Sequence, residues 1–330
     1  MQATKLRRLT GRLTSIGMGA CLLFAAGTAL AQWQPTKPLR FYLPFAPGGA
    51  AEAILRTVTD PLKDRLKQPI IIEAKPGGGQ LIAADAVAKS APDGYNVLWA
   101  SSTLIVSPIL TNSPFDVMKE LQPVIHIGET AIMLAVHPDI PARNMAEFVR
   151  YLKSNPGKVS YGFAGNGSSM QMAGELIKVR AGVEMVAVPY KGSAQLLPDL
   201  LAGRVPAAVD AITTLKPHVD AGKLRILAIM NNQRVPQLPD VPTMIEAGYD
   251  NFAIGPWNGF FLPAGTPRDI VNTLARETDA VLRMPAVVET LGRTAGALVR
   301  GGTPEQFTAM LRQDIAQTTR IIQTAGIKAE

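Results

Sequence analysis

Two glycine-bearing stretches contain residue types that can bind an anion. The first, Phe45-Ala-Pro-Gly-Gly-Ala-Ala-Glu52, follows an apolar run and precedes a segment with helical apolar spacing. The second, Ala164-Gly-Asn-Gly-Ser-Ser169, stands in the same way before a helical pattern. Glycine has no Cβ to cover the first N–H groups of a helix, and these groups lie at the positive end of the helix dipole. Each turn is therefore suited to hold a carboxylate.

Each of these features also has an explanation that needs no ligand. Gly48 and Gly49 could only make a tight connection, and Ser168 or Ser169 could be plain helix caps. A third turn, Val188-Pro-Tyr-Lys-Gly-Ser193, adds the cationic Lys191, but a lone lysine in a turn is usually solvated surface. The residues alone leave these alternatives open.

The segments that must position the turns alternate between strand and helix patterns. Strand patterns cover 39–43, 70–73, 96–100, 131–136, 159–163, 185–188, 207–210, 224–230 and 260–262. Helical patterns cover 54–66, 81–89, 144–154, 169–180, 194–201, 271–282 and 307–322. This alternation predicts open α/β sheets with helices on their faces. At 330 residues and 47% hydrophobic, the chain is long enough for two lobes with a cleft between them.

The first 31 residues have the pattern of a cleavable export signal. Ala29-Leu-Ala31 is a small-x-small cleavage site, so we expect cleavage before Gln32 and a periplasmic mature protein. A basic region precedes an apolar stretch at about 16–30, and its members are Lys5, Arg7, Arg8 and Arg12. A twin-arginine signal and lipidation at Cys21 stay open as alternatives.

Composition excludes several kinds of chemistry. Cys21 is the only cysteine and lies in the signal, so the mature protein should have no disulfide, reactive thiolate or cysteine metal site. The whole chain carries a net charge of +7, and the four basic residues of the signal account for more than half of it. Because there is no basic block interleaved with aromatic residues, we expect no nucleic-acid partner.

Together these stretches closely resemble the Bug family of periplasmic solute-binding proteins, the receptors of tripartite tricarboxylate transporters and their orphan relatives. The resemblance covers nearly the whole mature chain in the expected order. Besides the three turns, the matching stretches are Lys75-Pro-Gly-Gly-Gly79, Ala91-Pro-Asp-Gly-Tyr95, Asp199-Leu-Leu-Ala-Gly203, Pro217-His-Val-Asp-Ala-Gly-Lys-Leu-Arg225, Leu238-Pro-Asp-Val-Pro-Thr243 and Pro263-Ala-Gly-Thr-Pro267.

The resemblance implies an α/β, two-lobed periplasmic-binding-protein fold of type II-like architecture, with the ligand cleft between the lobes. We expect residues 32–133 and 256–330 to form one lobe and 134–255 the other, with closure about the strands near 131–136 and 253–262. The implied ligand is a small carboxylate, often a dicarboxylate, held mostly by backbone N–H groups and hydroxyls. The implied partners are transporter subunits of the inner membrane. We expect a monomer without a cofactor.

Site residues are carried over from the family by position. The first turn gives Gly48, Gly49, Ala50, Ala51 and Glu52, with Phe45 as an apolar wall, and the second gives Asn166, Gly167, Ser168, Ser169 and Gln171. Lys191, Gly192 and Asp210 match later pocket-side motifs, and Ser101 and Ser102 match a serine/threonine turn after the third strand. No catalytic and no metal-binding residue is expected.

This chain departs from the family pattern at both turns. The first commonly ends in Thr-Asp, but here it ends Ala51-Glu52; the second commonly continues with a histidine-leucine pair, but here it reads Met170-Gln-Met172. Loss of a hydroxyl and a histidine, with gain of methyl and thioether surface, should make the pocket less polar. We therefore expect a carboxylate with an apolar or aromatic body, such as terephthalate, rather than citrate or aspartate.

Other classes of function fit the residues less well. An enzyme lacks support because there is no G-x-S-x-G, Walker or dinucleotide motif in the right context. His126, His137 and His218 have no metal-ligand spacing, and the last two, each beside a proline, are expected in turns. The export signal argues against the effector domain of a LysR-type regulator. A periplasmic sensor that presents its ligand to a signalling kinase stays open.

Overall fold

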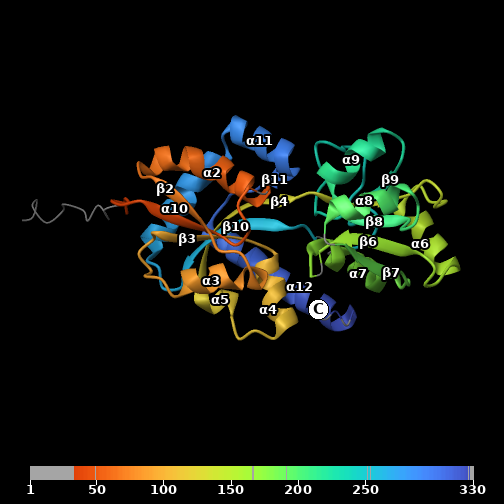
Figure 1. Cartoon of the computed structure of the whole chain (residues 1–330), viewed down its shortest axis with the longest axis horizontal. Coiled ribbons are helices and arrows are strands. Elements are labelled where there is room, and N and C mark those ends of the chain that lie inside the picture. Colours follow the sequence, from red (N-terminus) through yellow and green to blue (C-terminus); the bar gives the residue numbers. More distant parts are fainter. Residues whose placement is uncertain are drawn as a thin grey trace, which may run out of the picture. The chain divides into compact units, whose positions relative to one another are not determined.

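The computed structural model describes residues 33–48, 50–165, 167–190, 192–250, 252, 254–325 and 327. The predicted signal, its cleavage site and Cys21 lie outside these residues. Residues 35–330 form one compact unit, and its strands form two separate sheets (Figure 1).

The first lobe is built on a six-stranded mixed sheet in the order β11-β4-β10-β3-β1-β2. β1 pairs in parallel with β2 and β3, whereas β10 is antiparallel to β3 and β4, and β11 is antiparallel to β4. The strand bounds are β1 Leu39–Leu43, β2 Ile70–Ala74, β3 Asn96–Ser101, β4 Leu121–Thr130, β10 Trp257–Pro263 and β11 Ala297–Val299.

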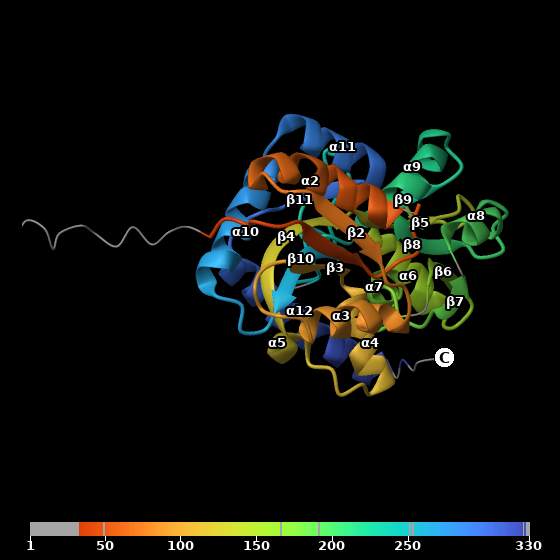
Figure 2. The same cartoon turned by 60° about the vertical axis from the view of Figure 1, so that its left-hand side comes forward.

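Helices cover both faces of this sheet. In both views α2, α10 and α11 lie on one face, and α3, α4, α5 and α12 lie on the other (Figures 1 and 2). The bounds are α2 Ala50–Leu66, α3 Leu81–Ala88, α4 Thr103–Thr111, α5 Val117–Glu120, α10 Arg268–Leu282, α11 Pro285–Ala295 and α12 Pro304–Ala325, with a short 3₁₀ turn at Gly78–Gln80. Apolar side chains at helical spacing, such as Leu55, Val58 and Leu62 of α2, are fully buried, as the amphipathic pattern requires.

The second lobe has a five-stranded mixed sheet in the order β7-β6-β8-β5-β9. β6 is parallel to β7 and β8, and β5 is antiparallel to β8 and β9. The bounds are β5 Ile132–Val136, α6 Met145–Ser154, β6 Ser160–Ala164, α7 Ser169–Ala181, β7 Val186–Tyr190, α8 Ser193–Leu201, β8 Ala207–Ala211, α9 Ile212–Asp220 and β9 Arg225–Ile229. The core on one face includes side chains of α6 and α7, and the core on the other includes side chains of α8 and α9.

Within the described residues, three segments run from one lobe to the other. β4 continues into β5 through Ala131, and the chain returns from β9 to β10 through residues 230–256. The third is α12, whose Phe307 and Leu311 pack in a core of the first lobe while Ile321 and Ile322 pack in a core of the second. α4 also bridges the lobes, because Val106 belongs to a second-lobe core.

The α/β two-lobed fold class is confirmed, and every strand and helix expected from the sequence is present with small shifts at its ends. The sequence patterns missed β4, β11, α4, α5, α9 and α11. Pro108 lies inside α4 and Pro217 inside α9, and proline weakens a helical pattern. The expected lobe boundaries and the closing motion stay predictions.

Candidate functional site

The first glycine turn joins β1 to α2, and its amide is not open as the sequence led us to expect. The N–H of Gly48, at φ 86°, donates to Glu52 Oε2 at 2.7 Å. Arg56, one turn further along α2, donates from Nε to the other carboxylate oxygen at 2.8 Å. The Gly48 N–H, and to a smaller extent Arg56, hold the pKa of the Glu52 carboxyl below its ordinary value.

The second turn, between β6 and α7, is closed in the same way. The N–H of Gly167 donates to Gln171 Oε1 at 2.7 Å, and the N–H of Gln171 donates to Ser168 Oγ at 3.3 Å. Ser168 is therefore the N-cap of α7, which is the reading that needs no ligand. The two turns share a design in which a side chain four residues on covers the glycine amide.

Two other amides of the predicted site differ from those of Gly48 and Gly167. Among the described residues, no acceptor pairs with the N–H of Ala51 at the start of α2 or with that of Ser169 at the start of α7. The expectation of uncovered amides is thus wrong for Gly48 and Gly167, and for Ala51 and Ser169 it stays a prediction.

Ser102 and Ser169 bring the two lobes into direct contact. Ser102 follows β3, Ser169 begins α7, and their hydroxyl oxygens are 2.9 Å apart with both residues buried. Close packing supports this contact, because a Cβ on Gly167 would meet the side chain of Leu110 of α4 at 2.9 Å. Predicted binding residues from opposite lobes therefore meet at hydrogen-bond distance.

Ser101 is held by Gln80, a residue that the sequence analysis missed. The Gln80 side chain is buried, accepts from the N–H of Ser101 at 3.1 Å and donates to the Ser101 hydroxyl. Gln80 adopts a left-handed backbone at φ 77° directly after three glycines. Its partner is 21 residues away, at the end of β3, so no local sequence signal could have revealed this role.

Asp210, at the end of β8, is completely buried with one unpaired oxygen. Its Oδ1 accepts from the hydroxyl of Ser193 at 2.9 Å and from the N–H of Ala211 at 2.6 Å, whereas Oδ2 has no partner. Burial raises the pKa of the Asp210 carboxyl, and these two donors oppose that shift. The structure thus places Asp210 inside the second lobe, next to the start of α8.

The remaining predicted residues divide into three groups. Phe45 is half-buried and packs edge-on against Trp99 with ring centroids 5.8 Å apart, as an apolar wall would. A Cβ on Gly192 would meet no atom within 4 Å, so this turn borders open space. Gly49, Asn166 and Lys191 lie outside the described residues, and the description of Ala50 is limited to its backbone at the start of α2.

Two expectations drawn from individual residues are wrong. Met172 is 2% exposed and packs in the second-lobe core, so its thioether does not line a cleft. His218 lies in the last turn of α9 and not in a turn between elements. His137 does follow β5 in an irregular segment, and His126 is buried, with its ring stacked on Phe307.

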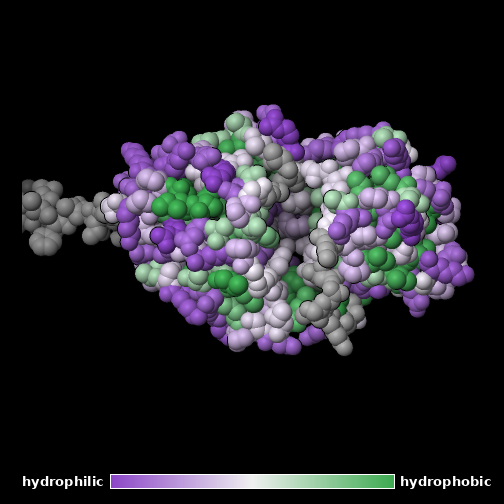
Figure 3. All heavy atoms as spheres, in the orientation of Figure 1, coloured by the Kyte–Doolittle hydropathy of each residue, from purple (hydrophilic) through white to green (hydrophobic). Residues whose placement is uncertain are grey.

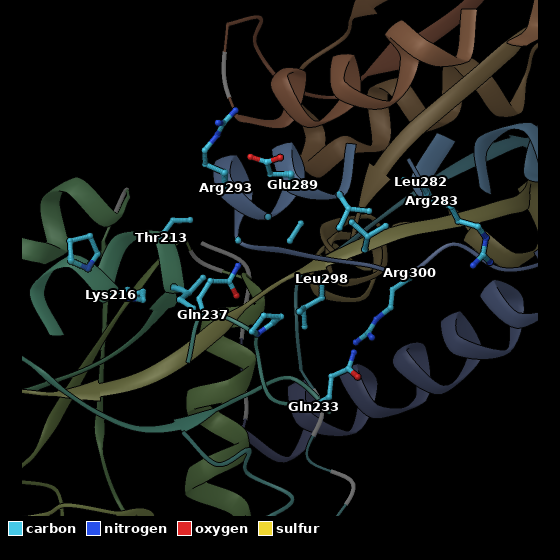
Figure 4. Close-up of a pocket in the computed structure, with 18 of the residues that line it drawn as sticks. Thr213, Lys216, Gln233, Gln237, Leu282, Arg283, Glu289, Arg293, Leu298 and Arg300 are labelled. Carbon is cyan, nitrogen blue, oxygen red and sulfur yellow. The ribbon is translucent and has the colours of Figure 1, made fainter. Parts of the chain in front are cut away.

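The space-filling view shows the surface hollowed between the two lobes (Figure 3). A cavity of about 1030 Å³ lies to one side of the lobe junction, walled by α9 and the 233–237 segment of one lobe and by α10, α11 and β11 of the other. Thr213 and Gln237 come from one wall, and Leu282 and Leu298 come from the facing wall (Figure 4).

This cavity is less suited to an anion than the turns are. Three of the four cationic side chains that line it are paired with carboxylates: Lys216 with Asp220 at 2.7 Å, Arg283 with Asp279 at 2.6 Å and Arg300 with Glu129 at 3.1 Å. Arg293 is the fourth. None of the residues predicted to bind the ligand lines it, although Ile212 and Thr213 follow Asp210 closely in the chain. The turns with the Ser102–Ser169 contact therefore form the candidate site.

Comparison with solved structures defines the class of protein. A solute-binding protein from Polaromonas, solved without ligand, superposes with a TM-score of 0.81 at 27% identity, covering 88% of this chain and 99% of that one. An R. palustris protein solved with adipate gives a TM-score of 0.72 at 32% identity, covering 89% and 99%. The two sheets and their helices are thus the fold of a two-lobed solute-binding protein.

Sequence comparison identifies the family. Residues 54–327 match the tripartite tricarboxylate transporter family receptor. The protein BugT of Bordetella pertussis is 31% identical over 323 residues, which cover 97% of this chain and 99% of that protein. The chain belongs to the tripartite tricarboxylate transporter receptor family, as the resemblance in its motifs implied. This is a family of receptors and not of enzymes.

Two further features are absent from the described residues. Within them no helix is long and apolar enough to cross a membrane. The same part of the chain contains no group of three or more His, Cys, Asp or Glu side chains able to hold a metal ion.

Proposed function

We propose that this protein captures a small carboxylate in the periplasm, between the β1–α2 and β6–α7 turns, and delivers it to a tripartite tricarboxylate-type transporter. The proposal assigns recognition to the first amides of α2 and α7 and to the hydroxyls of Ser101, Ser102 and Ser169. No catalysis is proposed.

The observation that carries this proposal is the contact between Ser102 and Ser169. Their hydroxyls, 2.9 Å apart, belong to segments that the sequence assigned to one binding site from opposite lobes. A ligand that contacts both segments has a higher affinity for the closed arrangement than for an open one. That differential affinity is what a ligand needs to drive closure about the linking strands near 131–136 and 253–262.

The energetics are sufficient without a cationic side chain. Taking a carboxylate out of water costs several kcal/mol. Each charge-assisted hydrogen bond returns about 1.5–3 kcal/mol, and a helix N-terminus adds about 0.3–2 kcal/mol. Two helix-start amides and two or three hydroxyls therefore support micromolar affinity, about −8 kcal/mol.

The proposed ligand is a dicarboxylate with an apolar body, aromatic acids such as terephthalate included. The adipate-bound relative supports an extended dicarboxylate with a hydrocarbon middle. Ala51, in place of a hydroxyl residue, and the half-buried Met170 and Phe45 support an apolar environment. Met172 is in the core and supplies no surface to such an environment.

A thermal-shift panel tests the ligand class. Adipate, terephthalate, citrate, malate and aspartate are added separately to the mature protein, since a ligand at 100 times its Kd raises stability by about 2.7 kcal/mol. Stabilisation by adipate or terephthalate is expected. Stabilisation only by citrate, malate or aspartate would reject the apolar body, and no shift with any carboxylate would reject the function.

Location and delivery need separate measurements. We propose that residues 1–31 are removed on export, so the N-terminal sequence of the purified periplasmic protein should begin at Gln32.

We also propose that residues 32–133 with 256–330, and residues 134–255, are the two moving lobes. Scattering profiles that are identical with and without saturating ligand would contradict this motion. Pull-down of transporter subunits, and not of a sensor kinase, from membrane fractions is the expected result for delivery.

A further inference from the structure

Asn231 is a buried side chain at the point where the lobes are connected. It lies just after β9 and is 0% exposed. The segment from β4 to β5 passes beside it at Thr130–Ile132, and the segment that leads to β10 passes beside it at Gly255. The Asn231 side chain therefore contacts both connecting segments.

The Asn231 carboxamide uses its donors and its acceptor on the first connecting segment. Oδ1 accepts from the N–H of Ile132 at 3.1 Å, and Nδ2 donates to the carbonyl of Thr130 and to Glu129 Oε2, both at 3.2 Å. A buried carboxamide satisfied in this way prefers one arrangement of the backbone around it, because any other arrangement leaves a polar group unpaired.

Gly255 supplies the space for this arrangement from the second connecting segment. A Cβ at Gly255 would lie 2.3 Å from Asn231 Nδ2, far closer than atoms approach. Gly255 does not have a positive φ, so its requirement for glycine is one of space and not of backbone conformation. The next residue, Pro256, accepts a hydrogen bond from the N–H of Thr130 at 2.8 Å, which fixes the two segments side by side.

Glu129 extends the contact to a third segment. Arg300 donates from Nε to Glu129 Oε1 at 3.1 Å, and its Nη2 donates to Asn232 Oδ1 at 3.0 Å. A cavity of about 160 Å³ lined by Glu129, Asn232 and Gly255 lies beside this network.

We propose that Asn231 is a positioning residue for ligand capture: its carboxamide, seated against Gly255, sets the angle at which the two lobes rest. This proposal rests on the proposed function in one respect, namely that ligand capture involves closure of the lobes. Without these hydrogen bonds the connecting segments can adopt a larger number of arrangements, and only some of these allow the lobes to close on the ligand. Apparent affinity falls in proportion to the fraction of molecules in the competent arrangement.

Four variants of the full mature chain test this role: Asn231→Ser, Gly255→Ala, the double variant, and Asn155→Ser as control. The side chain of Asn155 donates to the Tyr151 carbonyl in the last turn of α6, so its loss acts within one lobe. Small-angle scattering measures lobe separation without ligand, and calorimetry with adipate measures affinity. Each single hinge variant should weaken adipate binding about tenfold, the equivalent of one or two hydrogen bonds.

The double variant separates positioning from simple loss of stability. The shorter serine leaves room for the new Cβ, so the double variant should bind no more weakly than either single variant. Without ligand, the distribution of lobe separations derived from scattering should broaden for Asn231→Ser and stay unchanged for Asn155→Ser. Additive losses in the double variant, or lower melting temperatures with unchanged scattering, would overturn the proposal.

The ligand-free scattering also keeps this proposal distinct from the proposed function. If adipate and the other carboxylates fail to bind the unmodified protein, the proposed function fails. A broadened ligand-free profile for Asn231→Ser would still support the positioning role, and an unchanged one would refute it.

Discussion

Substitution of Ser102 and Ser169, whose hydroxyls are hydrogen-bonded, tests whether contact between the two lobes contributes to ligand affinity. Each hydroxyl comes from a different lobe, and both residues are buried. Replacing either serine by alanine removes the bond and leaves the other hydroxyl buried without a partner. The open arrangement loses little, because water can hydrate the remaining hydroxyl there. Each single substitution therefore shifts the balance between the lobes toward the open arrangement.

The size of this shift follows from hydrogen-bond energetics. A neutral hydrogen bond contributes about 0.5–1.5 kcal/mol, and an unsatisfied buried partner costs about 1–3 kcal/mol. A single alanine variant should thus disfavour closure by about 1–2 kcal/mol, which corresponds to about a 5- to 30-fold loss of affinity. In the double variant both hydroxyls are gone, so its loss should be clearly smaller than the sum of the two single losses.

Calorimetric titration with adipate as the probe measures this double-mutant cycle. Ser107→Ala is a matched control, because Ser107 is a buried serine of α4 whose hydroxyl bonds within the first lobe, to Gly78. It should change melting temperature but not affinity. Additive losses, with a coupling below about 0.3–0.5 kcal/mol between Ser102 and Ser169, would refute the reasoning, since such additivity is typical of independent sites.

Three further predictions concern single ionisable groups. Burial lowers the pKa of His126 from 6.5 to about 4, so between these pH values the imidazole is protonated in the unfolded chain and neutral in the folded one. The free energy of unfolding should therefore decrease as the pH is lowered from 6.5 to 4. Chemical denaturation of His126→Phe should show a smaller decrease. Burial raises the pKa of Asp210, so the protein loses stability as pH rises through that pKa; Asp210→Asn should have a melting-temperature advantage that grows with pH and disappears in acid. Glu52→Gln keeps an acceptor for the Gly48 N–H but removes a negative charge from the first turn, so adipate titrations should show several-fold tighter binding; unchanged or weaker binding would place the ligand away from this turn.

The sequence predicted the strands and helices that have regular apolar spacing, and it failed where that spacing is interrupted. β4 contains Pro123 and Gly128 and pairs with two strands far away in the chain, β10 and β11. Its position in the sheet depends on those long-range pairs and not on local preference. The missed helices α4 and α9 contain internal prolines, but so do α2 and α8, which were predicted, so proline alone does not account for the missed helices.

At the candidate site, the sequence identified both glycine turns but not the state of their amides. Glu52 and Gln171 lie four residues after the glycines that they cover, and the same residues would also be compatible with side chains turned to solvent. Similarly, Met172 belongs to the apolar pattern of α7 whichever way that helix faces, and only packing placed it in the core. Rotamers and helix orientation decide these questions, and both depend on neighbours distant in sequence.

The amino-acid sequence by itself determined the α/β class, the two glycine turns and the family, because each is encoded by residue types at short spacing. The tertiary structure decided that the amides of Gly48 and Gly167 are covered, that Ser102 meets Ser169, and that Asn231 bonds to Ile132. The last two contacts join residues 67 and 99 positions apart. They exist only when both sheets have formed and α4, α7 and α12 have packed together, so no local pattern can specify them.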